Sequence, residues 1–355
     1  MISKKVNKVN NLMKIFEIRK RSFGCLLLRL GCCLMLSTSL LGGEALAQTA
    51  PTTPGQQWPS RPGRLIVTAA PGGTLDALAR VLAEDFSRNL GHPWVVETRA
   101  GVSGNLGAEL LVKSAADGYT ALVCPAGPFA INAQLLPSMP FDPQRDLAPV
   151  TLLAVAPQLL VVHPSVPAKN LRELIDWARS RGKVNFASQG IGSTGQLAME
   201  LLRSRLPFEV NHIPYKGSAG AATDLIAGHV SMAFDNATQA LANVRAGKLR
   251  AIGVAERKRL ALAPDLPTIE EQGVPGFEAT SWLALTLRAG TAREIVQRMH
   301  AEAVRVMKRP EVVERFARTG VETRTSSSPE EFVAYIKAET EKWGGIIRAT
   351  GARAD

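Results

Sequence analysis

Cysteine and histidine are scarce in this chain, and their scarcity excludes several kinds of chemistry. Of the four cysteines only Cys124 lies beyond residue 47, so the rest of the chain has no pair for an internal disulfide. The five histidines are scattered and never adopt zinc-ligand spacing. The sequence also lacks a G-x-S-x-G nucleophile motif, a phosphate-binding G-x-x-x-x-G-K-[ST] loop and an evident acid–base pair. We therefore expect no catalytic residues, no metal, no cofactor and no enzymatic activity.

Long blocks of one charge are absent beyond the N-terminus. Residues 1–47 hold eight of the 42 Lys and Arg and two of the 31 Asp and Glu, which leaves the remainder with a net charge of +5. Because this remainder has no basic block with interleaved aromatic residues, nucleic acid is not an expected partner. A mild positive charge suits an anionic ligand.

Residues 1–47 have the pattern of a secretory signal peptide. Basic residues precede an apolar run over 23–41, which only Arg29 interrupts, and the small-x-small site Ala45-Leu46-Ala47 follows. A retained membrane anchor is the alternative, because the apolar run is long. We expect cleavage near Ala47 and a mature chain that begins with a flexible leader over residues 48–62.

Beyond the leader, apolar segments of strand length alternate with helical patterns. This alternation is typical of α/β lobes with largely parallel sheets flanked by helices. The helix after the first strand carries Leu78, Val81, Leu82 and Phe86 on one face and ends at Gly91. Strands are expected at 64–67, 93–97, 120–124, 150–162, 183–187, 208–213, 230–235, 249–254 and 282–287, and further helices at 105–115, 193–205 and 217–227.

The apolar segment Val150–Val162 has no helical punctuation and is predicted to cross from one lobe to a second. The chain returns through the strand at 282–287 and ends with three helices that complete the first lobe. We expect lobe 1 to comprise residues 63–157 plus 281–355 and lobe 2 to comprise residues 158–280. Three helix starts are also predicted from capping patterns: Asn170 with Glu173, Thr291 with Glu294, and Ser328 with Glu331.

Three loops that follow a strand and begin a helix are the candidate ligand-binding segments. In the first, Ala69–Asp76, glycines allow close approach of the backbone and the helix start offers free amides to an anion. The alternative is an ordinary turn that Thr74 or Asp76 caps. The candidate binding residues here are Ala70, Gly72, Gly73, Thr74, Leu75 and Asp76.

The second loop, Ser188–Gly195, matches the G-x-G-x-x-G spacing of dinucleotide-binding proteins. The acidic residue expected about 20 positions later should end the next strand, whereas Glu209 begins it. A dinucleotide-dependent oxidoreductase is therefore the less favoured interpretation, and a helix N-terminus that holds a carboxylate is preferred. The candidate binding residues are Ser188, Gly192, Ser193 and Thr194.

The third loop contains Tyr215 and Lys216, and a later strand ends at Asp235. Tyr215 is a candidate wall of a pocket, Lys216 a candidate positive charge, and Asp235 a candidate hydrogen-bond acceptor. The alternatives are packing for Tyr215, solvent exposure for Lys216 and helix capping for Asp235.

Motifs in these loops and between them are similar to those of the Bug (TctC-type) family, the receptors of tripartite tricarboxylate transporters. The resemblance runs from about Trp58 to the C-terminus. The motifs include Pro59-Ser60-Arg61-Pro62, Gly72-Gly73-x-x-Asp76, Leu90-Gly91-x-Pro93, Gly104-Asn105-x-Gly107, Ala116–Thr120, Asn132, Phe141-Asp142-Pro143, Pro149-Val150, Pro214–Gly217, Phe234-Asp235, Ala246–Ala251, Pro267-Thr268 and Pro275-Gly276.

This resemblance implies a two-lobed type II periplasmic-binding-protein fold and a monomer in the periplasm. It implies that the loops Ala70–Asp76 and Ser188–Thr194 hold a small carboxylate, partly through water, with Asn132 near the cleft. Delivery would be to integral membrane transporter subunits, one large and one small. The carboxylate is expected at the amides of Gly72 to Leu75 and of Gly192 to Thr194.

Several positions depart from the family pattern. Thr68-Ala69 replaces a common Pro-Phe, Leu75 stands where a small polar residue is frequent, and Gln196 stands where His is frequent. These changes leave open whether the ligand is a di- or tricarboxylate, an amino acid or an aromatic acid. A receptor that feeds a signalling system instead of a transporter is the alternative function on the same fold.

Overall fold

The computed structural model describes residues 58–69, 71–101 and 104–353. The predicted signal peptide, most of the leader and Ala70 lie outside these residues. In the part of the chain that the model describes, no helix is both long enough and apolar enough to cross a membrane.

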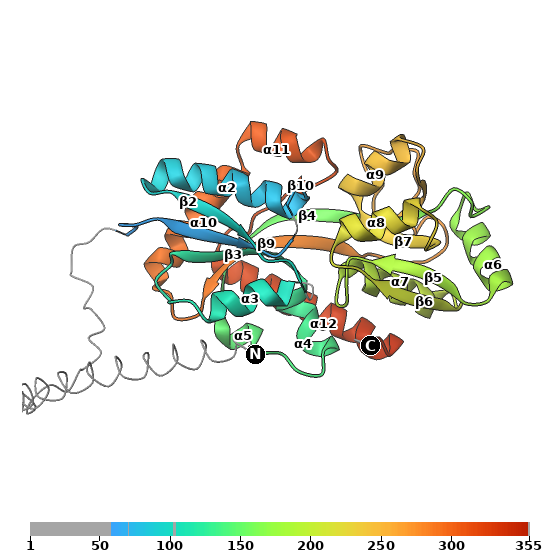
Figure 1. The fold of residues 1–355 in the computed structure, drawn as a ribbon, viewed down its shortest axis with the longest axis horizontal. Helices are drawn as coiled ribbons and strands as arrows, with labels where there is room; N and C mark the ends of the chain where they lie inside the picture. Colours follow the sequence, from blue (N-terminus) through green and yellow to red (C-terminus); the bar gives the residue numbers. More distant parts are fainter. Residues whose placement is uncertain (1–57, 70, 102–103, 354–355) are drawn as a thin grey trace, which may run out of the picture. The chain divides into compact units, whose positions relative to one another are not determined.

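The first lobe is built on a mixed sheet with the strand order β2-β1-β3-β9-β4 (Figure 1). The first three of these strands are parallel, and the last two pair in antiparallel fashion. Strand β1 lies between β2 and β3 and is parallel to both, while β9 is antiparallel to β3 and to β4. The short β10 pairs with β4. The strands are β1 (Gly63–Val67), β2 (Trp94–Thr98), β3 (Thr120–Pro125), β4 (Leu147–Val162), β9 (Thr280–Arg288) and β10 (Glu322–Thr323).

Alternation along β1 sorts the helices of this lobe onto two faces. Leu65 and Val67 pack with α2, α10 and α11, whereas Ile66 packs with α3, the π-helical turn η2 and α12. These elements are α2 (Thr74–Leu90), α3 (Asn105–Val112), η2 (Gly127–Ile131), α10 (Arg293–Met307), α11 (Pro310–Ala317) and α12 (Pro329–Thr350), with the short α4 (Asn132–Leu135) and α5 (Pro143–Asp146) between η2 and β4.

The second lobe repeats the plan. Strand β5 is parallel to β6 and β7, and the second half of β4 is antiparallel to β7 and β8. Leu160 and Val162 face α6 and α7, whereas Leu159 and Val161 face α8 and α9. The elements are β5 (Val184–Ser188), β6 (Val210–Pro214), β7 (Met232–Asn236), β8 (Arg250–Val254), α6 (Leu171–Arg181), α7 (Thr194–Arg205), α8 (Ser218–Ile226) and α9 (Ala237–Arg245). The predicted α/β class is confirmed.

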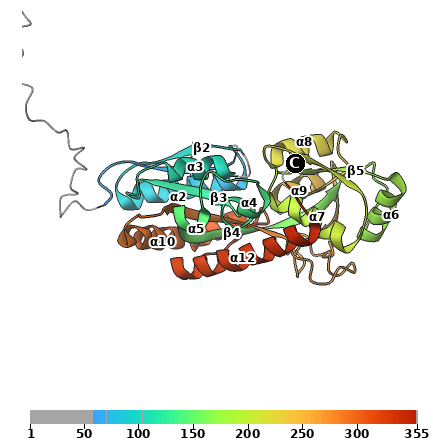
Figure 2. The ribbon, with the colours of Figure 1, turned by 90° about the horizontal axis from the view of Figure 1, so that it is seen from below.

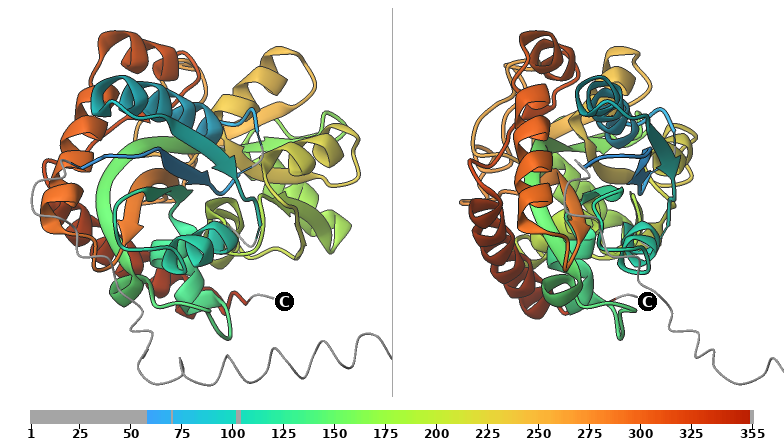
Figure 3. Two further views of the ribbon diagram at one scale, coloured as in Figure 1. Left: turned by 60° about the vertical axis from the view of Figure 1, so that its left-hand side comes forward. Right: turned by 90° about the vertical axis from the view of Figure 1, so that its left-hand side faces the viewer.

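Strand β4 belongs to both sheets. It pairs with β9 as far as Pro157, opposite Thr280, and with β7 from Gln158, opposite Asn236. Its register against β9 shifts twice, and such bulges bend a strand, in agreement with the strongly curved β4 of Figure 3. The lobe boundaries at 157/158 and 280/281 stay a prediction. The exchange of β9 for β7 as the neighbour of β4 agrees with them.

Helix α12 packs against elements of both lobes, and Figure 2 shows it running beneath β4 towards α7. Its Phe332 and Trp343 are fully buried. The indole nitrogens of Trp282 and Trp343 both donate to Glu339 Oε2 at 2.9 Å. A buried carboxylate on α12 thus holds one tryptophan from β9 and one from its own helix.

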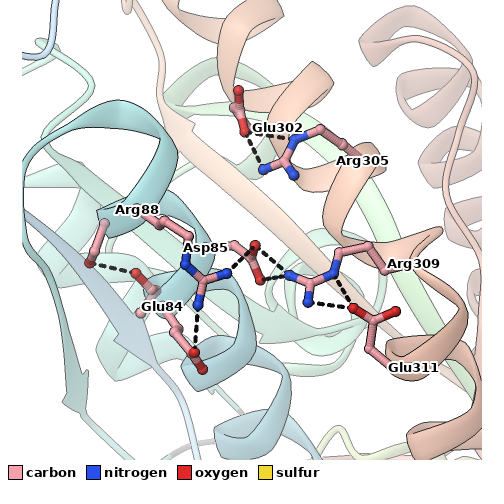
Figure 4. Close-up of polar contacts among 9 residues, drawn as sticks. Glu84, Asp85, Arg88, Glu302, Arg305, Arg309 and Glu311 are labelled. Carbon is pink, nitrogen blue, oxygen red and sulfur yellow. Dashed lines mark hydrogen bonds and ion pairs between the residues drawn. The ribbon is translucent and has the colours of Figure 1, made fainter.

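An ion-pair cluster joins α2 to the α10–α11 segment (Figure 4). Both carboxylate oxygens of the buried Asp85 accept from Arg309 Nη1, at 2.5 and 2.6 Å. Arg309 Nε also donates to Glu311, and Arg88 Nη1 lies 3.5 Å from Asp85 Oδ1. This charge-assisted contact, from one guanidinium nitrogen to both carboxylate oxygens, fixes how α2 packs on the C-terminal helices.

Two of the three predicted helix caps are confirmed. The side chains of Asn170 and Ser328 accept from the amides of Glu173 and Glu331. The prediction for Thr291 is wrong: α10 has Ala292 as its N-cap, and Thr291 Oγ1 donates to the Arg288 carbonyl at 2.7 Å. Threonine competes for backbone acceptors in turns, and here the turn before the helix uses its hydroxyl.

Candidate ligand-binding cleft

A cavity of about 780 Å³ lies where the two lobes meet. Its wall is formed by the loops that follow β1, β2, β3, β5, β6 and β7, together with Ala156 and Gln158 of β4 and Ser281 and Leu283 of β9. Four helices of at least nine residues, α2, α7, α8 and α9, begin at this wall. Their N-terminal amides carry partial positive charge, so the cavity is electrostatically suited to an anion.

The loop between β1 and α2 is held by Asp76. The amide of Gly72, which has a positive φ of 88°, donates to Asp76 Oδ2 at 3.0 Å, and Arg80 Nε donates to the same oxygen at 2.9 Å. Burial alone would raise the pKa of Asp76, but the hydrogen bonds from Arg80 and Gly72 together hold it below its usual value. Asp76 therefore supports the loop from behind and does not line the cavity.

The first turn of α2 leaves amides unused. Gly72, Gly73, Thr74 and Leu75 all line the cavity. The amides of Gly73, Thr74 and Leu75 donate to no atom of the described residues, because the start of a helix has no acceptors of its own for them. These three amides, and not that of Gly72, are available to an anion.

The loop between β5 and α7 has a similar internal support. The amide of Gly192 donates to Gln196 Oε1 at 2.8 Å, and the amide of Ser193 donates to the Gly190 carbonyl at 3.1 Å. Ser193 Oγ caps α7 by accepting from the Gln196 amide. Of the three amides expected to meet a carboxylate, only that of Thr194 donates to no described atom.

Ser188 shapes this loop from a fully buried position. Its hydroxyl lies 2.6 Å from His212 Nε2 and 3.1 Å from the Gly190 carbonyl, which it donates to. Ser188 does not line the cavity, whereas Gly192, Ser193 and Thr194 do. Glu209, which the dinucleotide interpretation requires, precedes β6 and is not part of the cavity wall either.

Tyr215 and Lys216 line the cavity in the loop before α8. The Tyr215 hydroxyl donates to Asp224 Oδ2 at 2.5 Å, so the ring is fixed and its hydroxyl is engaged. Burial and the neighbouring Asp224 raise the pKa of Tyr215 to about 12. Lys216 is exposed at the rim.

Asn132 and Asp235 lie behind the wall. Asn132 Nδ2 donates to Asn105 Oδ1 at 2.6 Å, and its own Oδ1 is buried without a partner among the described residues. A Cβ atom added at Gly192 would lie only 2.2 Å from that oxygen. Asn132 of lobe 1 therefore lies very close to the loop before α7. Asp235 Oδ1 accepts from Gln189 Nε2 at 3.1 Å and from the Asn236 amide at 2.9 Å.

Sequence reasoning missed several polar residues of the wall. Thr74 Oγ1 donates to Thr238 Oγ1 across the cavity at 3.4 Å, and Gln158 Nε2 donates to Asn236 Oδ1 at 2.5 Å. Asn236 and Thr238 follow directly on Asp235, so the end of β7 was the signal. Gln158, Gln189, Ser218, Gln239 and Ser281 complete the missed polar set.

The buried carboxyl of Asp235 leads to a pH-dependent prediction. Burial raises its pKa from 3.8 to about 6 despite hydrogen bonds from Gln189, the Asn236 amide and Ser218. The folded state therefore holds this proton to higher pH than the unfolded state. The stability that protonation contributes is complete below about pH 4 and is lost as pH rises through 6.

In Asp235→Asn, urea unfolding should show a stability gain over wild type that grows by about 2–3 kcal/mol from pH 4 to pH 7. A gain of the same size at both pH values, or the same trend in the exposed control Asp265→Asn, would contradict this assignment.

Comparison with known proteins identifies the family of this chain. The model of the tripartite tricarboxylate transporter family receptor matches residues 78–352. The chain is a member of this family. It is 37% identical over 313 residues, 87% of its length and 93% of the other protein, to a UPF0065 protein of Pseudomonas sp. (strain P51). It is 36% identical over 311 residues, covering 87% and 95%, to BugT of Bordetella pertussis (strain Tohama I).

Two solved structures of carboxylate complexes share the fold of this tripartite tricarboxylate transporter receptor. Rpa4515 of R. palustris with adipate superposes with a TM-score of 0.80 at 34% identity, covering 83% of this chain and 99% of that one. MatC of Rhodopseudomonas palustris with bound malate gives 0.77 at 29% identity, covering 81% and 99%. The predicted family and the periplasmic-binding-protein fold are confirmed. Receptors of this family are periplasmic solute-binding proteins.

Proposed function

We propose that this receptor captures a small carboxylate-bearing molecule in the cavity between its lobes and delivers it to the large and small membrane subunits of a tripartite tricarboxylate-type transporter. One observation carries the proposal. The amides of Thr74 and Leu75 on one lobe, and of Thr194 on the other, donate to no atom of the described residues and line the same cavity. A carboxylate between them receives charge-assisted hydrogen bonds from both lobes, and binding thus favours the closed arrangement.

Further support comes from the wall and from the relatives. The Thr74–Thr238 hydroxyl contact spans the cavity, as expected of a closed receptor. The relatives with adipate and malate bind dicarboxylates on the same fold. Nothing in the described wall combines a nucleophile with a base, so we propose that the receptor catalyses no reaction and acts as a periplasmic monomer.

A thermal-shift screen tests the proposal. Purified mature protein is unfolded and refolded to remove any bound solute and is then heated with dicarboxylates, tricarboxylates, amino acids, aromatic acids and NAD. An acid at about 100 times its dissociation constant should stabilise the fold by about 2.7 kcal/mol, a shift of several degrees. An unchanged melting temperature with every acid would contradict the proposal, and stabilisation by NAD alone would restore the oxidoreductase interpretation.

The role of the Thr74 amide is testable with a proline. Thr74 is the first residue of α2, a position where proline is common. Gly73 before it is extended at φ −84° and ψ 175°, which is the conformation that a following proline favours. Thr74→Pro removes the amide donor and is expected to weaken acid binding about 10-fold with little change in Tm. Thr74→Ala, which keeps the amide and loses the hydroxyl, is the control. Equal titration curves for Thr74→Pro and wild type would remove this amide from the site.

Transport and sensing are separable by deletion of the gene. Loss of growth on the bound acid, restored by the gene, supports transport. Unchanged uptake of that acid together with a lost transcriptional response to it would favour a signalling receptor.

A further inference from the structure

We propose that the cavity selects against a positively charged amino group, so that its ligand is a carboxylic acid without an α-ammonium. This inference rests on the proposed function and narrows the ligand class within it. It follows from which hydrogen-bonding groups of the wall are occupied and which are unused.

The first observation concerns carboxylates. No residue that lines the cavity within the described chain is acidic. Three acids each stand behind a lining residue and hold it: Asp76 accepts from Gly72, Asp224 from Tyr215, and Asp235 from Gln189. These carboxylates support the wall and leave no counter-charge on its surface for an ammonium group.

The second observation concerns backbone carbonyls, which are the other usual acceptors for an ammonium. Several carbonyls in and beside the loops around the cavity already accept hydrogen bonds. The Ser188 carbonyl accepts from the Tyr215 amide at 3.1 Å, and the Phe234 carbonyl accepts from Gln189 Nε2 at 2.8 Å. The same holds for the carbonyls of Val67, Gly73, Gly101 and Gly190.

The third observation concerns donors. The amides of Thr74, Leu75 and Thr194 are unused by the described residues, and Lys216 has no ion-pair partner among them. The N-termini of α2, α7, α8 and α9 add positive potential at the same wall. The described wall thus offers amide donors and positive potential, and its acceptors, such as Thr68 Oγ1 and Gln158 Oε1, carry no formal charge.

An ammonium group in this cavity loses its water, meets a positive potential and finds no charged partner. Desolvation of an uncompensated charge costs several kcal/mol, and repulsion from Lys216 adds to it. A carboxylate of the same skeleton without the amino group has no such penalty. We expect each amino acid to bind at least about 100-fold more weakly than its deaminated analogue, which corresponds to about 2.7 kcal/mol.

Isothermal titration with matched pairs tests this selection on the refolded mature protein. The pairs are succinate with aspartate, glutarate with glutamate, and 3-phenylpropanoate with phenylalanine. Tight binding of one deaminated acid and at least 100-fold weaker binding of its amino acid supports the inference. An amino acid that binds as tightly as its analogue overturns it and leaves the receptor function intact. Absence of binding by every acid overturns the receptor function with it.

A variant tests the electrostatic cause. Thr238 lines the cavity at the second position of α9, where an acidic residue is favourable for the helix. Thr238→Asp introduces the missing counter-charge and should reduce the preference for the deaminated acid by at least about 10-fold. The neutral control Thr238→Asn should keep the wild-type preference. A preference unchanged in Thr238→Asp, with both variants folded, contradicts the proposed cause and overturns the inference.

Discussion

Ser193→Asp is expected to weaken acid binding by at least about 100-fold while the protein stays folded. Ser193 lines the cavity and caps α7, and aspartate is as good a cap as serine, so the helix start is retained. The new carboxylate, however, places a negative charge beside the Thr194 amide and repels an anionic ligand. Loss of the charge-assisted hydrogen bond from this amide costs about 1.5–3 kcal/mol of binding free energy, and the repulsion adds to this loss. Isothermal titration of the best acid from the screen measures the effect.

The matched control is Ser193→Asn, which caps helices equally well without a charge. Its affinity should stay within about 10-fold of wild type because asparagine adds no negative charge beside the Thr194 amide. If Ser193→Asp bound the acid as wild type does, the β5–α7 loop would lie outside the ligand site.

Glu339→Ala is expected to cause the largest loss of stability. The buried carboxylate accepts from the indole nitrogens of Trp282 and Trp343, both at 2.9 Å, and alanine leaves both donors unpaired. An unsatisfied buried donor costs about 1–3 kcal/mol, which gives about 2–5 kcal/mol for the pair. Differential scanning calorimetry should show Tm lowered by about 5–10 °C.

Glu339→Gln separates the hydrogen bonds from the charge. The amide oxygen still accepts, so the destabilisation should be less than half that of Glu339→Ala. A Glu339→Ala protein that melts within about 1 °C of wild type would show that the two indoles find other acceptors, and the assigned role of Glu339 would be wrong.

The elements that reach the cavity were predictable from the sequence because their patterns are local. Alternation and short apolar runs located the strands, and the uninterrupted run in β4 correctly indicated a strand buried on both faces. Glycine-containing loops between a strand and a helix marked the segments around Gly72 and Gly192, which line the cavity.

Side-chain direction within those loops was not predictable. Asp76, Asn132, Ser188 and Asp235 carry suitable groups at suitable places, yet each is buried behind the wall. Their hydrogen bonds run to backbone or side chains that only the folded loops bring within reach. The same limit applies to Thr291, whose spacing to Glu294 fits a cap although its hydroxyl belongs to the preceding turn.

The polar residues missed by sequence reasoning reach the cavity through tertiary structure. Gln158 lies in the middle of an apolar strand, and only the change of sheets at that point turns it towards the cleft. Gln189 lies directly before the first glycine of the loop, and its hydrogen bonds to the end of β7 fix it in the wall. No periodicity in the sequence signals either position.

The most direct test is a crystal structure of the mature receptor with the acid that binds most tightly in the screen. We expect a carboxylate of that acid in the cavity, with its oxygens within hydrogen-bonding distance, about 3 Å, of the amides of Thr74 and Thr194. An acid bound at another surface, or in the cavity with its carboxylate directed away from both amides, would contradict the proposed binding site.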